Sequence, residues 1–327
     1  KTLSCPICKA ATSCVYEGMK GYIEDSLFDI YECSVCNASF VDPLSSNESV
    51  YNSIYSYGEK ISGYMRYYRF AEVVKKVKKP LSLLAESENV YWSVQQALLQ
   101  YVPKKEDVKI LEIGSGLGYL TYSLNQEGYS TLGIDISKKA VEKATKNYGN
   151  YYECANLFDL AEERKASYDV VIMTELLEHV EDPVLFVKAA SSLIKQGGKI
   201  ILTTPNKDKT PRGFVWQNDI PPVHLFWFSE KSIDVLAKQC GKQCEFINFI
   251  PYTTKYYEYD VNIPLSQIEA NLPRLTKEGR IFEGRSVENI KSKFFSVYVY
   301  TQISNFLRRL KPKTISARST SMCAVLQ

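Results

Sequence analysis

Histidine is scarce in this sequence, with only two residues in 327. Any chemistry that needs an imidazole must therefore use His179 or His224. Charge of one sign is also lacking, because 40 Lys and Arg oppose 37 Asp and Glu for a net charge of +3. This balance excludes binding of nucleic acid by overall charge alone. Long hydrophobic runs are missing too: the uncharged run from Phe294 to Leu307 contains Ser, Thr, Gln and Asn, and it is too short and polar to span a bilayer.

Cysteine, in contrast, is frequent and unevenly distributed. The chain has nine, and five of them fall within the first forty residues. An odd number with this distribution fits a secreted disulfide framework poorly, so we expect a cytoplasmic protein.

Two Cys-x-x-Cys pairs, Cys5 with Cys8 and Cys33 with Cys36, are separated by twenty-four residues. Two such turns can present four thiolates to one tetrahedral zinc ion, and four sulfur ligands leave no open position, so the zinc would be structural. A reducible dithiol pair is the alternative, but that role calls for a Cys-x-x-Cys at the start of a helix, which this segment does not offer. Cys14 would then be a spare thiol.

The residue pattern divides the chain into four parts. Residues 1–43 form the zinc-binding module, which is too small to bury a core unaided. Residues 44–105 place apolar and aromatic side chains at helical spacing and predict a helical lid or linker. Residues 106–251 plus 319–327 would form a sheet domain, and residues 252–318, which lack a strand pattern, an inserted subdomain.

The sheet domain is predicted to be of the α/β class. From residue 108 onward, short apolar runs alternate with longer amphipathic segments, which is typical of a parallel sheet. The expected strands are Val108–Ile113, Ser130–Ile134, Asp169–Met173, Lys199–Thr203, Cys244–Ile250 and Met322–Leu326. Ser137 and Ser229 are expected to cap the starts of two of the helices between these strands.

A glycine-rich turn follows the first strand, where Gly114, Gly116 and Gly118 recur at every second position. Glycines there let the backbone turn sharply and approach a nucleotide-like ligand. Asp135 ends the next strand, twenty-one residues after Gly114, where a carboxylate can accept hydrogen bonds from both ribose hydroxyls. Tyr119 stands where a dinucleotide fingerprint has glycine, which argues against NAD and FAD.

Taken together, these residues resemble the class I S-adenosylmethionine-dependent methyltransferases. The match consists of Glu112-x-Gly-x-Gly-x-Gly, Asp135-Ile136-Ser137, Asn156-Leu157, Tyr168-Asp169-Val170-Val171 leading to Glu178-His179-Val180, and Gly197-Gly198-Lys199. The resemblance implies a Rossmann-like seven-stranded sheet, here with a zinc-ribbon-like module before it and an insertion before the last strand.

The same resemblance implies a binding site for S-adenosylmethionine. The glycine loop would hold the methionine half, Asp135 the ribose, Ile136 one face of the adenine and Asn156 the adenine amino group. The family more often has Asp at the position of Asn156, but Asn still offers a carbonyl acceptor. The full set of expected cofactor residues is Glu112, Gly114, Ser115, Gly116, Gly118, Asp135, Ile136, Asn156, Leu157 and Glu175.

Both histidines are expected at the same edge of the sheet. Glu175, Glu178 and His179 follow the fourth strand, and His224 lies in the loop after the fifth, so all four should meet where parallel sheets bind ligands. One hypothesis makes His179 or His224 a general base for a substrate hydroxyl. A second has all four residues bind Mg, Mn or Co, which would acidify that hydroxyl. In a third, Glu178 and His179 only cap a helix and orient the loop.

Two further features leave the choice of partner open. The neighbouring loops are rich in aromatic residues, namely Phe214, Trp216 and the run Phe226 to Phe228. Such rings either stack on a ligand or form hydrophobic core under a lid. The segment from Arg274 to Arg318 holds eleven Lys or Arg and three Glu. It could lie on an anionic membrane or touch phosphates, but packing against the sheet domain or a second subunit is the simpler expectation.

The function expected from the whole sequence is methyl transfer to a small-molecule hydroxyl, with a sugar as the preferred acceptor. Bacterial sugar O-methyltransferases and ubiquinone-pathway enzymes show a similar Glu-His-Val and His-x-x-x-Phe pattern. The Glu-x-x-Glu-His segment is also similar to that of small-RNA 2′-O-methyltransferases, so RNA is the rival acceptor, with a Glu/His-bound metal. A binding module that kept the fold without the chemistry is the remaining alternative.

Overall fold

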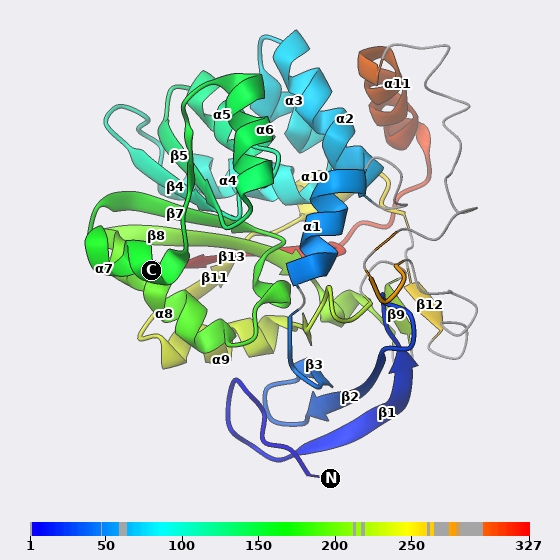
Figure 1. Ribbon diagram of the computed structural model, residues 1–327. Helices are drawn as coiled ribbons and strands as arrows, with labels where there is room; N and C mark the ends of the chain where they lie inside the picture. Colours follow the sequence, from blue (N-terminus) through cyan, green and yellow to red (C-terminus); the bar gives the residue numbers. More distant parts are fainter. Residues whose placement is uncertain are drawn as a thin grey trace.

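The computed structural model describes residues 2–46, 48–58, 64–211, 214–216, 220–259, 262–264, 275–278, 280 and 297–327. Within these ranges the strands form three sheets, of which the largest has seven strands in the order β11-β13-β8-β7-β4-β5-β6 (Figure 1). Its strands are β4 (Lys109–Ile113), β5 (Ser130–Asp135), β6 (Tyr152–Cys154), β7 (Tyr168–Thr174), β8 (Ile194–Pro205), β11 (Cys244–Phe246) and β13 (Ser321–Leu326).

Strand β13 runs antiparallel to both of its neighbours, and the pairs between β6 and β8 are all parallel. The chain moves outward from β4 through β5 to β6 and then returns to the other side of β4 with β7 and β8. The point between β4 and β7 where this direction reverses is where open α/β sheets bind ligands. The sheet is the Rossmann-like sheet that the sequence predicted.

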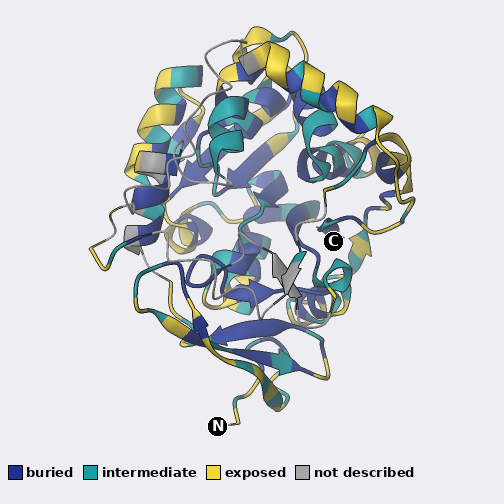
Figure 2. Cartoon of the chain, turned by 90° about the vertical axis from the view of Figure 1, so that its right-hand side faces the viewer, coloured by how far each residue is buried: buried dark blue, intermediate teal, exposed yellow. Residues whose placement is uncertain are grey.

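Helices cover both faces of this sheet, because alternate residues of its buried strands point to opposite sides. Val171 and Met173 of β7 pack in a core with helices of one face, and Val170 and Ile172 pack with those of the other. The first face carries α7 (Leu157–Glu163), α8 (Pro183–Leu193) and α9 (Glu230–Gln239), and the second α5 (Tyr119–Gln126) and α6 (Lys138–Tyr148). Exposed residues lie along the outer sides of the helices (Figure 2).

Two helix caps occur where the sequence predicted them. The Ser137 hydroxyl accepts a hydrogen bond from the backbone N–H of Ala140 and starts α6. Ser229 and Ser232 form a reciprocal capping box that starts α9. Both caps satisfy backbone donors that the first turn of a helix leaves without partners.

The Tyr- and Lys-rich segment is helical, as its spacing predicts. It contains α1 (Glu48–Tyr57), α2 (Met65–Val73), the short 3-10 helix η2 (Val74–Lys76), α3 (Pro80–Ser87) and α4 (Asn89–Tyr101). Pro80 at the first position of α3 has no N–H to leave unsatisfied, so it suits a helix start. Helices α3 and α4 join the core of the second face of the large sheet.

The N-terminal module is a small antiparallel sheet that is completed from elsewhere in the chain. Its own strands are β1 (Thr12–Lys20), β2 (Leu27–Cys33) and β3 (Ser39–Asp42), and its fourth is β10 (Phe226–Trp227). Residues of the module and of the first face of the large sheet share one hydrophobic core. The module therefore has no hydrophobic core of its own, because it contains too few residues to bury one.

The predicted strand Cys244–Ile250 is too long, since β11 ends at Phe246 and α10 (Ile250–Lys255) begins inside the predicted range. The Asn248 side chain accepts a hydrogen bond from the Ile250 N–H, and Pro251 stands in the first turn. These two residues favour a helix start over a continuing strand.

The inserted segment is described only in part, because residues 260–261, 265–274, 279 and 281–296 lie outside the described ranges. Strand β12 (Asn262–Pro264) pairs with β9 (Phe214–Trp216), and α11 (Val297–Leu310) packs near α2 and α3 (Figure 1). Two short 3-10 helices, η3 (Leu177–His179) and η4 (Lys207–Lys209), follow β7 and β8. None of the described helices is long and apolar enough to cross a membrane.

Candidate active site at the carboxyl edge of the sheet

The glycine loop joins β4 to α5 by a backbone path that side chains would obstruct. Gly114 and Gly118 have φ angles of 74° and 81°, which L-residues rarely adopt. A Cβ atom at Gly118 would also lie 2.6 Å from the Cβ of Ala144. The loop is fastened to β5, because the N–H groups of Gly114 and Ser115 donate to the carbonyl of Ile134 at 2.8 and 2.9 Å.

Asp135 ends β5 and holds the turn from the other side. Its two carboxylate oxygens accept hydrogen bonds from the N–H groups of Gly116 and Ser137 at 2.9 and 2.8 Å. These bonds fix the orientation of the carboxylate, which lines the cavity beside the glycine loop. Ile136, the next residue, has 72% of its side chain exposed beside the same cavity, as a residue that covers a flat ring would.

Ser115 adds evidence that a polar group belongs in this loop. Its hydroxyl is buried and has no hydrogen-bond partner among the described residues, which costs about 1–3 kcal/mol when nothing compensates. The carboxylate, the exposed Ile136 and this hydroxyl together fit a nucleoside-containing cofactor.

Two of the expected cofactor residues have structural partners of their own. Glu112 is buried and accepts a hydrogen bond from the Thr121 hydroxyl of α5, and burial raises its pKa to about 8. Asn156 caps α7, since its side-chain oxygen accepts the Phe158 N–H at 2.8 Å. An adenine amino group would therefore share the Asn156 carbonyl with this cap. Leu157 is buried at the start of the helix.

A cavity of about 1600 Å³ joins this loop to both histidines. It is lined on one side by the glycine loop and Asp135 and on another by Glu178, His179 and His224. The helical segment and the insertion complete its wall through residues that include Arg66, Glu88, Tyr67, Glu258 and Tyr257. The chain thus encloses one continuous space large enough for a cofactor and an acceptor.

The two histidine rings meet at the edge of the sheet, as their positions in the sequence predicted. The centroids of His179 and His224 lie 4.7 Å apart in an edge-to-face arrangement. Nδ1 of His179 lies 2.5 Å from the carbonyl oxygen of Val223, so this nitrogen carries the proton and donates it. Nε2 of His179 is then the acceptor nitrogen, and it lies 3.9 Å from Oε1 of Glu178.

Burial keeps both imidazoles neutral. Desolvation lowers the pKa of His179 below its ordinary value, and it lowers that of His224 much further, with the neighbouring His179 adding to the effect. Tyr51 of α1 contacts the His179 ring edge-to-face with a centroid distance of 6.0 Å. Its hydroxyl also donates to the Val223 carbonyl at 3.3 Å, so α1 helps to fix the position of His179.

The two glutamates occupy different positions in this site. Glu178 is 1% exposed and one of its oxygens accepts from the Thr204 hydroxyl at 2.9 Å, while burial raises its pKa to about 8. Glu178, His179 and His224 offer ligand atoms that all lie within 4.8 Å of one another, a set that Glu175 does not join. Glu175 has a left-handed backbone with φ of 48°, and burial raises its pKa well above the ordinary value.

The aromatic loop residues divide between core and cavity. Phe226 and Phe228 are buried, and their rings stack 5.4 Å apart. Tyr64, Tyr67 and Tyr68 line the cavity instead. The core interpretation therefore holds for Phe226 and Phe228, while the side chains of Phe214 and Trp216 lie outside the described part of the structure.

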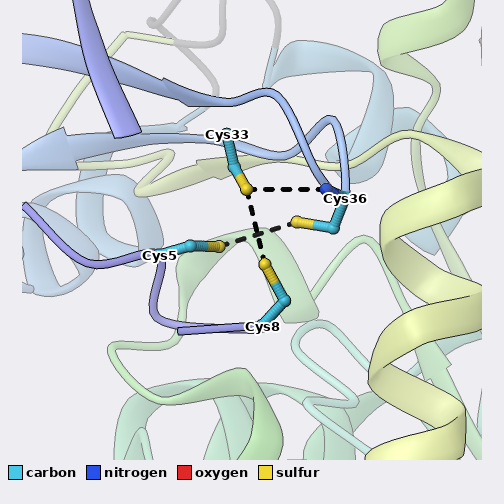
Figure 3. Close-up of side chains that lie close together, drawn as sticks. All are labelled: Cys5, Cys8, Cys33 and Cys36. Carbon is cyan, nitrogen blue, oxygen red and sulfur yellow. Dashed lines mark hydrogen bonds between the residues drawn. The ribbon is translucent and has the colours of Figure 1, made fainter. Parts of the chain in front are cut away.

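Four cysteines of the N-terminal module gather at one point. The sulfur atoms of Cys5 and Cys36 lie 3.6 Å apart and those of Cys8 and Cys33 lie 3.4 Å apart, and all four side chains point toward a common centre (Figure 3). The hydrogen bond between the Cys5 and Cys36 thiols lowers the pKa of Cys5 and raises that of Cys36, so Cys5 is the member of this pair that more readily becomes the thiolate that a metal requires. All nine cysteines are free, and Cys14 lies outside the cluster.

The cysteine cluster is linked through the backbone to the segment that holds His224. The N–H of Val41 donates to the carbonyl of Leu225 at 3.1 Å, and Phe226 and Trp227 pair with Phe40 and Ser39. The N–H of Leu225 donates in turn to the carbonyl of Glu178 at 2.8 Å. Sequence reasoning did not find this link, because a strand of two residues has no periodicity to detect.

Comparison with known proteins agrees with this geometry. A family model described as a methyltransferase domain matches residues 83–245. The ubiquinone biosynthesis O-methyltransferase of Leptothrix cholodnii is 37% identical over 123 residues, which cover 36% of this chain and 51% of that protein. The enzyme of the same name from Idiomarina loihiensis is 35% identical over 105 residues, or 31% of this chain and 43% of that protein. The chain spans about half the length of the curated relatives it matches.

Solved structures resemble the chain more distantly. A SAM-dependent methyltransferase from Archaeoglobus fulgidus matches with a TM-score of 0.43 and 16% identity, over 71% of this chain and 92% of that one. Magnesium protoporphyrin IX methyltransferase from Synechocystis PCC 6803 matches with a TM-score of 0.42 and 20% identity, over 60% and 90% of the two chains. By its matched residues, the chain contains a methyltransferase domain, and its strand order is the Rossmann-like one that the sequence resemblance implied.

Proposed function

We propose that this protein transfers the methyl group of S-adenosylmethionine to a hydroxyl group of a small-molecule acceptor. The observation that carries the proposal is the single cavity that joins the glycine loop and Asp135 to His179 and His224. Holding a donor and an acceptor in line supplies much of the acceleration that such a transfer needs. The ubiquinone-pathway relatives, named as O-methyltransferases, support oxygen as the methylated atom.

The bound cofactor would supply an electrophilic methyl group, and the remaining requirements fall on residues of this chain. The glycine loop and Asp135 would hold the nucleoside, with Ile136 over the adenine. His179 is the residue that we assign as general base, because its Nδ1–H is held by the Val223 carbonyl and leaves Nε2 as the acceptor. Nε2 lies 3.9 Å from Oε1 of Glu178, and both residues line the cavity. Nε2 would take the hydroxyl proton as the acceptor oxygen bonds the methyl carbon and the thioether leaves, and the Val223 carbonyl, which holds Nδ1–H, would stabilise the resulting imidazolium.

A divalent metal is the second mechanism that a specific observation favours. Glu178, His179 and His224 present mixed oxygen and nitrogen donors within 4.8 Å of one another, and Oε1 of Glu178 is buried without a hydrogen-bond partner among the described residues. With two imidazoles and one carboxylate, this donor set fits Mn better than Mg, which prefers oxygen ligands. These three residues would hold the ion, and the Val223 carbonyl would orient His179 from behind. A metal there would acidify the acceptor hydroxyl.

The two mechanisms give different results in one experiment. Methyl transfer is measured before and after chelation that removes Mg and Mn but retains the N-terminal zinc, and then after each metal is added back. Transfer that persists through chelation supports His179 as the base. Transfer that disappears and returns with Mg or Mn assigns the three residues to a metal instead. His179→Ala should abolish transfer in both cases, so it serves as the common reference.

The acceptor that we favour is a sugar hydroxyl, on either a nucleotide or a lipid carrier. Polar side chains of the helical segment and the insertion, among them Glu88 and Glu258, line the cavity together with tyrosine rings such as Tyr67 and Tyr257. Arg66 pairs with Glu88, and Asn89 and Ser319 donate to Glu258, so both carboxylates are fixed in position. Acceptor groups and ring faces of this kind suit a ligand with several hydroxyls. A panel of sugars, phenols and short RNA tests the class, and transfer to RNA with steep salt dependence would overturn the sugar assignment.

We also propose that Cys5, Cys8, Cys33 and Cys36 bind one structural zinc ion. Their clustered sulfur atoms and the lowered pKa of Cys5 support a tetrahedral thiolate site. Metal analysis of the purified protein should find about one zinc per chain, and substitution of any of the four cysteines by Ser should remove it. Retention of zinc in such a variant would contradict the assignment.

A further inference from the structure

Helix α11 is attached to the protein by its polar side. Thr301, Asn305 and Arg308 have only 1%, 4% and 7% of their surface exposed, and their spacing of four and three residues places them on one face. The Asn305 amide donates to the Ser87 hydroxyl at 3.0 Å. The Arg308 guanidinium donates to the Glu86 and Ser87 carbonyls at the end of α3 and to the Tyr257 carbonyl. These bonds fix the orientation of the helix.

The opposite side of α11 is apolar and faces outward. Ile303, Phe306, Leu307 and Leu310 have 45%, 57%, 50% and 65% of their surface exposed, and the spacing of three, four and seven residues makes them one stripe (the α11 stripe). A helix on the surface of a water-soluble protein normally has the reverse arrangement. Figure 1 shows α11 at the outer edge of the molecule. Such an inverted helix fits contact with an apolar environment or partner.

Cations border the stripe at its C-terminal end. Lys311 and Lys313 follow the helix directly and are exposed, and neither has a carboxylate partner in the ranges that the structure describes. The Lys311 ammonium lies 4.5 and 5.0 Å from the ring centroids of Tyr259 and Tyr257. No Asp or Glu occurs between residues 289 and 327, whereas seven Lys or Arg do. Helix α11 and the residues after it therefore carry only basic charges of their own, and Glu86 of α3 pairs with one of them, Arg309, at 2.9 Å.

From these observations we propose that α11 docks on an anionic phospholipid surface, with the α11 stripe in the interfacial layer and Lys311 and Lys313 on the lipid head groups. Apolar burial and attraction to anionic lipid add together in helices of this kind, and Tyr259 has the amphipathic ring that favours the same boundary. A second copy of this chain fits less well, because α11 and the residues after it carry no carboxylate of their own that could pair with these lysines in a symmetric contact.

The same helix forms part of the wall of the cavity. Ser304 and Arg308 of α11 line it together with the residues of the proposed active site. If the proposed methyl transfer is correct, docking would bring the cavity next to the bilayer, and an acceptor with a lipid tail could reach it. That step depends on the proposed function, whereas the docking itself does not.

Flotation of the 327-residue chain with vesicles tests the proposal without cofactor or acceptor. Vesicles of phosphatidylcholine alone are compared with vesicles that also contain phosphatidylglycerol. We expect binding only to the second kind, weakened by salt. The double variant Phe306→Ser/Leu307→Ser should bind at least about tenfold more weakly. Lys311→Glu/Lys313→Glu should lose the preference for phosphatidylglycerol.

The matched control is Leu27→Ser, since Leu27 of β2 is 58% exposed in a different part of the molecule. It should bind vesicles within about twofold of the unsubstituted chain. Circular dichroism and a cooperative thermal transition show that each variant is folded. Absence of binding to phosphatidylglycerol vesicles would overturn the proposal, as would undiminished binding by the Phe306→Ser/Leu307→Ser variant. A dimer in sedimentation that this variant dissociates would assign the stripe to a second copy instead.

Discussion

Replacement of Cys36 by Ser should impair methyl transfer far more than it impairs cofactor binding. Cys36 lies three residues before the start of β3, and β3 pairs with β10. Strand β10 begins two residues after His224. The Cys36 carbonyl also accepts a hydrogen bond from the Ser229 hydroxyl at 3.2 Å. Loss of zinc from the four cysteines would make this end of the module less ordered. The segment from Leu225 to Ser229, which is bonded to it, would lose order as well.

The size of the effect follows from the bonds that cross between the two segments. The bonds that cross are the Val41 to Leu225 bond, the pairing of β3 with β10 and the Ser229 to Cys36 bond. At about 1 kcal/mol for each hydrogen bond, they stabilise the His224 segment by roughly 3–4 kcal/mol. Their complete loss corresponds to a factor of up to about a thousand in the population of the ordered segment. We expect turnover to fall by about tenfold to a thousandfold, because release of the module need not be complete.

The assay measures turnover with the true acceptor, and calorimetry measures the affinity for S-adenosylmethionine. The glycine loop and Asp135 are fastened to β4 and β5 rather than to the module, so affinity should change by less than about threefold. Cys14→Ser is the matched control, because Cys14 belongs to the same module and lies outside the cluster. Equal turnover in Cys36→Ser and Cys14→Ser would refute the coupling, and so would a joint loss of turnover and cofactor affinity in Cys36→Ser alone.

Three further predictions concern titration and cofactor contact. Burial lowers the pKa of His179 below 6.5, so a base at this position should give kcat/KM that is flat above pH 6.5 and falls below it, and an acid limb centred above pH 7 would contradict the assignment. Burial raises the pKa of Glu112 from 4.5 to about 8, so its contribution to stability is full below pH 4.5 and lost as the pH rises toward 8. The free energy of unfolding of Glu112→Gln should therefore rise relative to that of the unsubstituted protein by up to about 1.4 kcal/mol per pH unit in that window. Denaturation at several pH values measures this difference, and a difference that does not change with pH would contradict the burial argument. Ile136→Ser should weaken cofactor binding by about fivefold to twentyfold, and an unchanged affinity would show that Ile136 does not cover the adenine.

Much of the central sheet was predictable because its signals are local. The turn after β4 needs glycine at positions such as Gly114 and Gly118, where φ is positive, and Asp135 stands at the end of the next strand. The meeting of His179 and His224 was also predictable, although they are far apart in sequence. Parallel strands place their carboxyl ends at one edge of the sheet, so two loops that follow such strands must be neighbours.

Other features depend on contacts that no local pattern announces. The pairing of β10 with β3 joins residues 226 and 40 through two positions only. The strand predicted to extend to Ile250 ends at Phe246, because the Asn248 side chain accepts the Ile250 N–H and turns the chain into α10. The orientation of α11 was likewise hidden, since Arg308 is buried by carbonyl groups of α3 that the sequence of α11 cannot reveal.

Calorimetric titration with S-adenosylmethionine tests the central claim most directly. We predict saturable binding with a dissociation constant below about 1 mM for the unsubstituted protein. Asp135→Ala should bind about tenfold to a hundredfold more weakly, because hydrogen bonds to a charged group contribute about 1.5–3 kcal/mol. Failure of the unsubstituted protein to bind the cofactor at millimolar concentration, or equal affinity in Asp135→Ala, would contradict the proposed cofactor site.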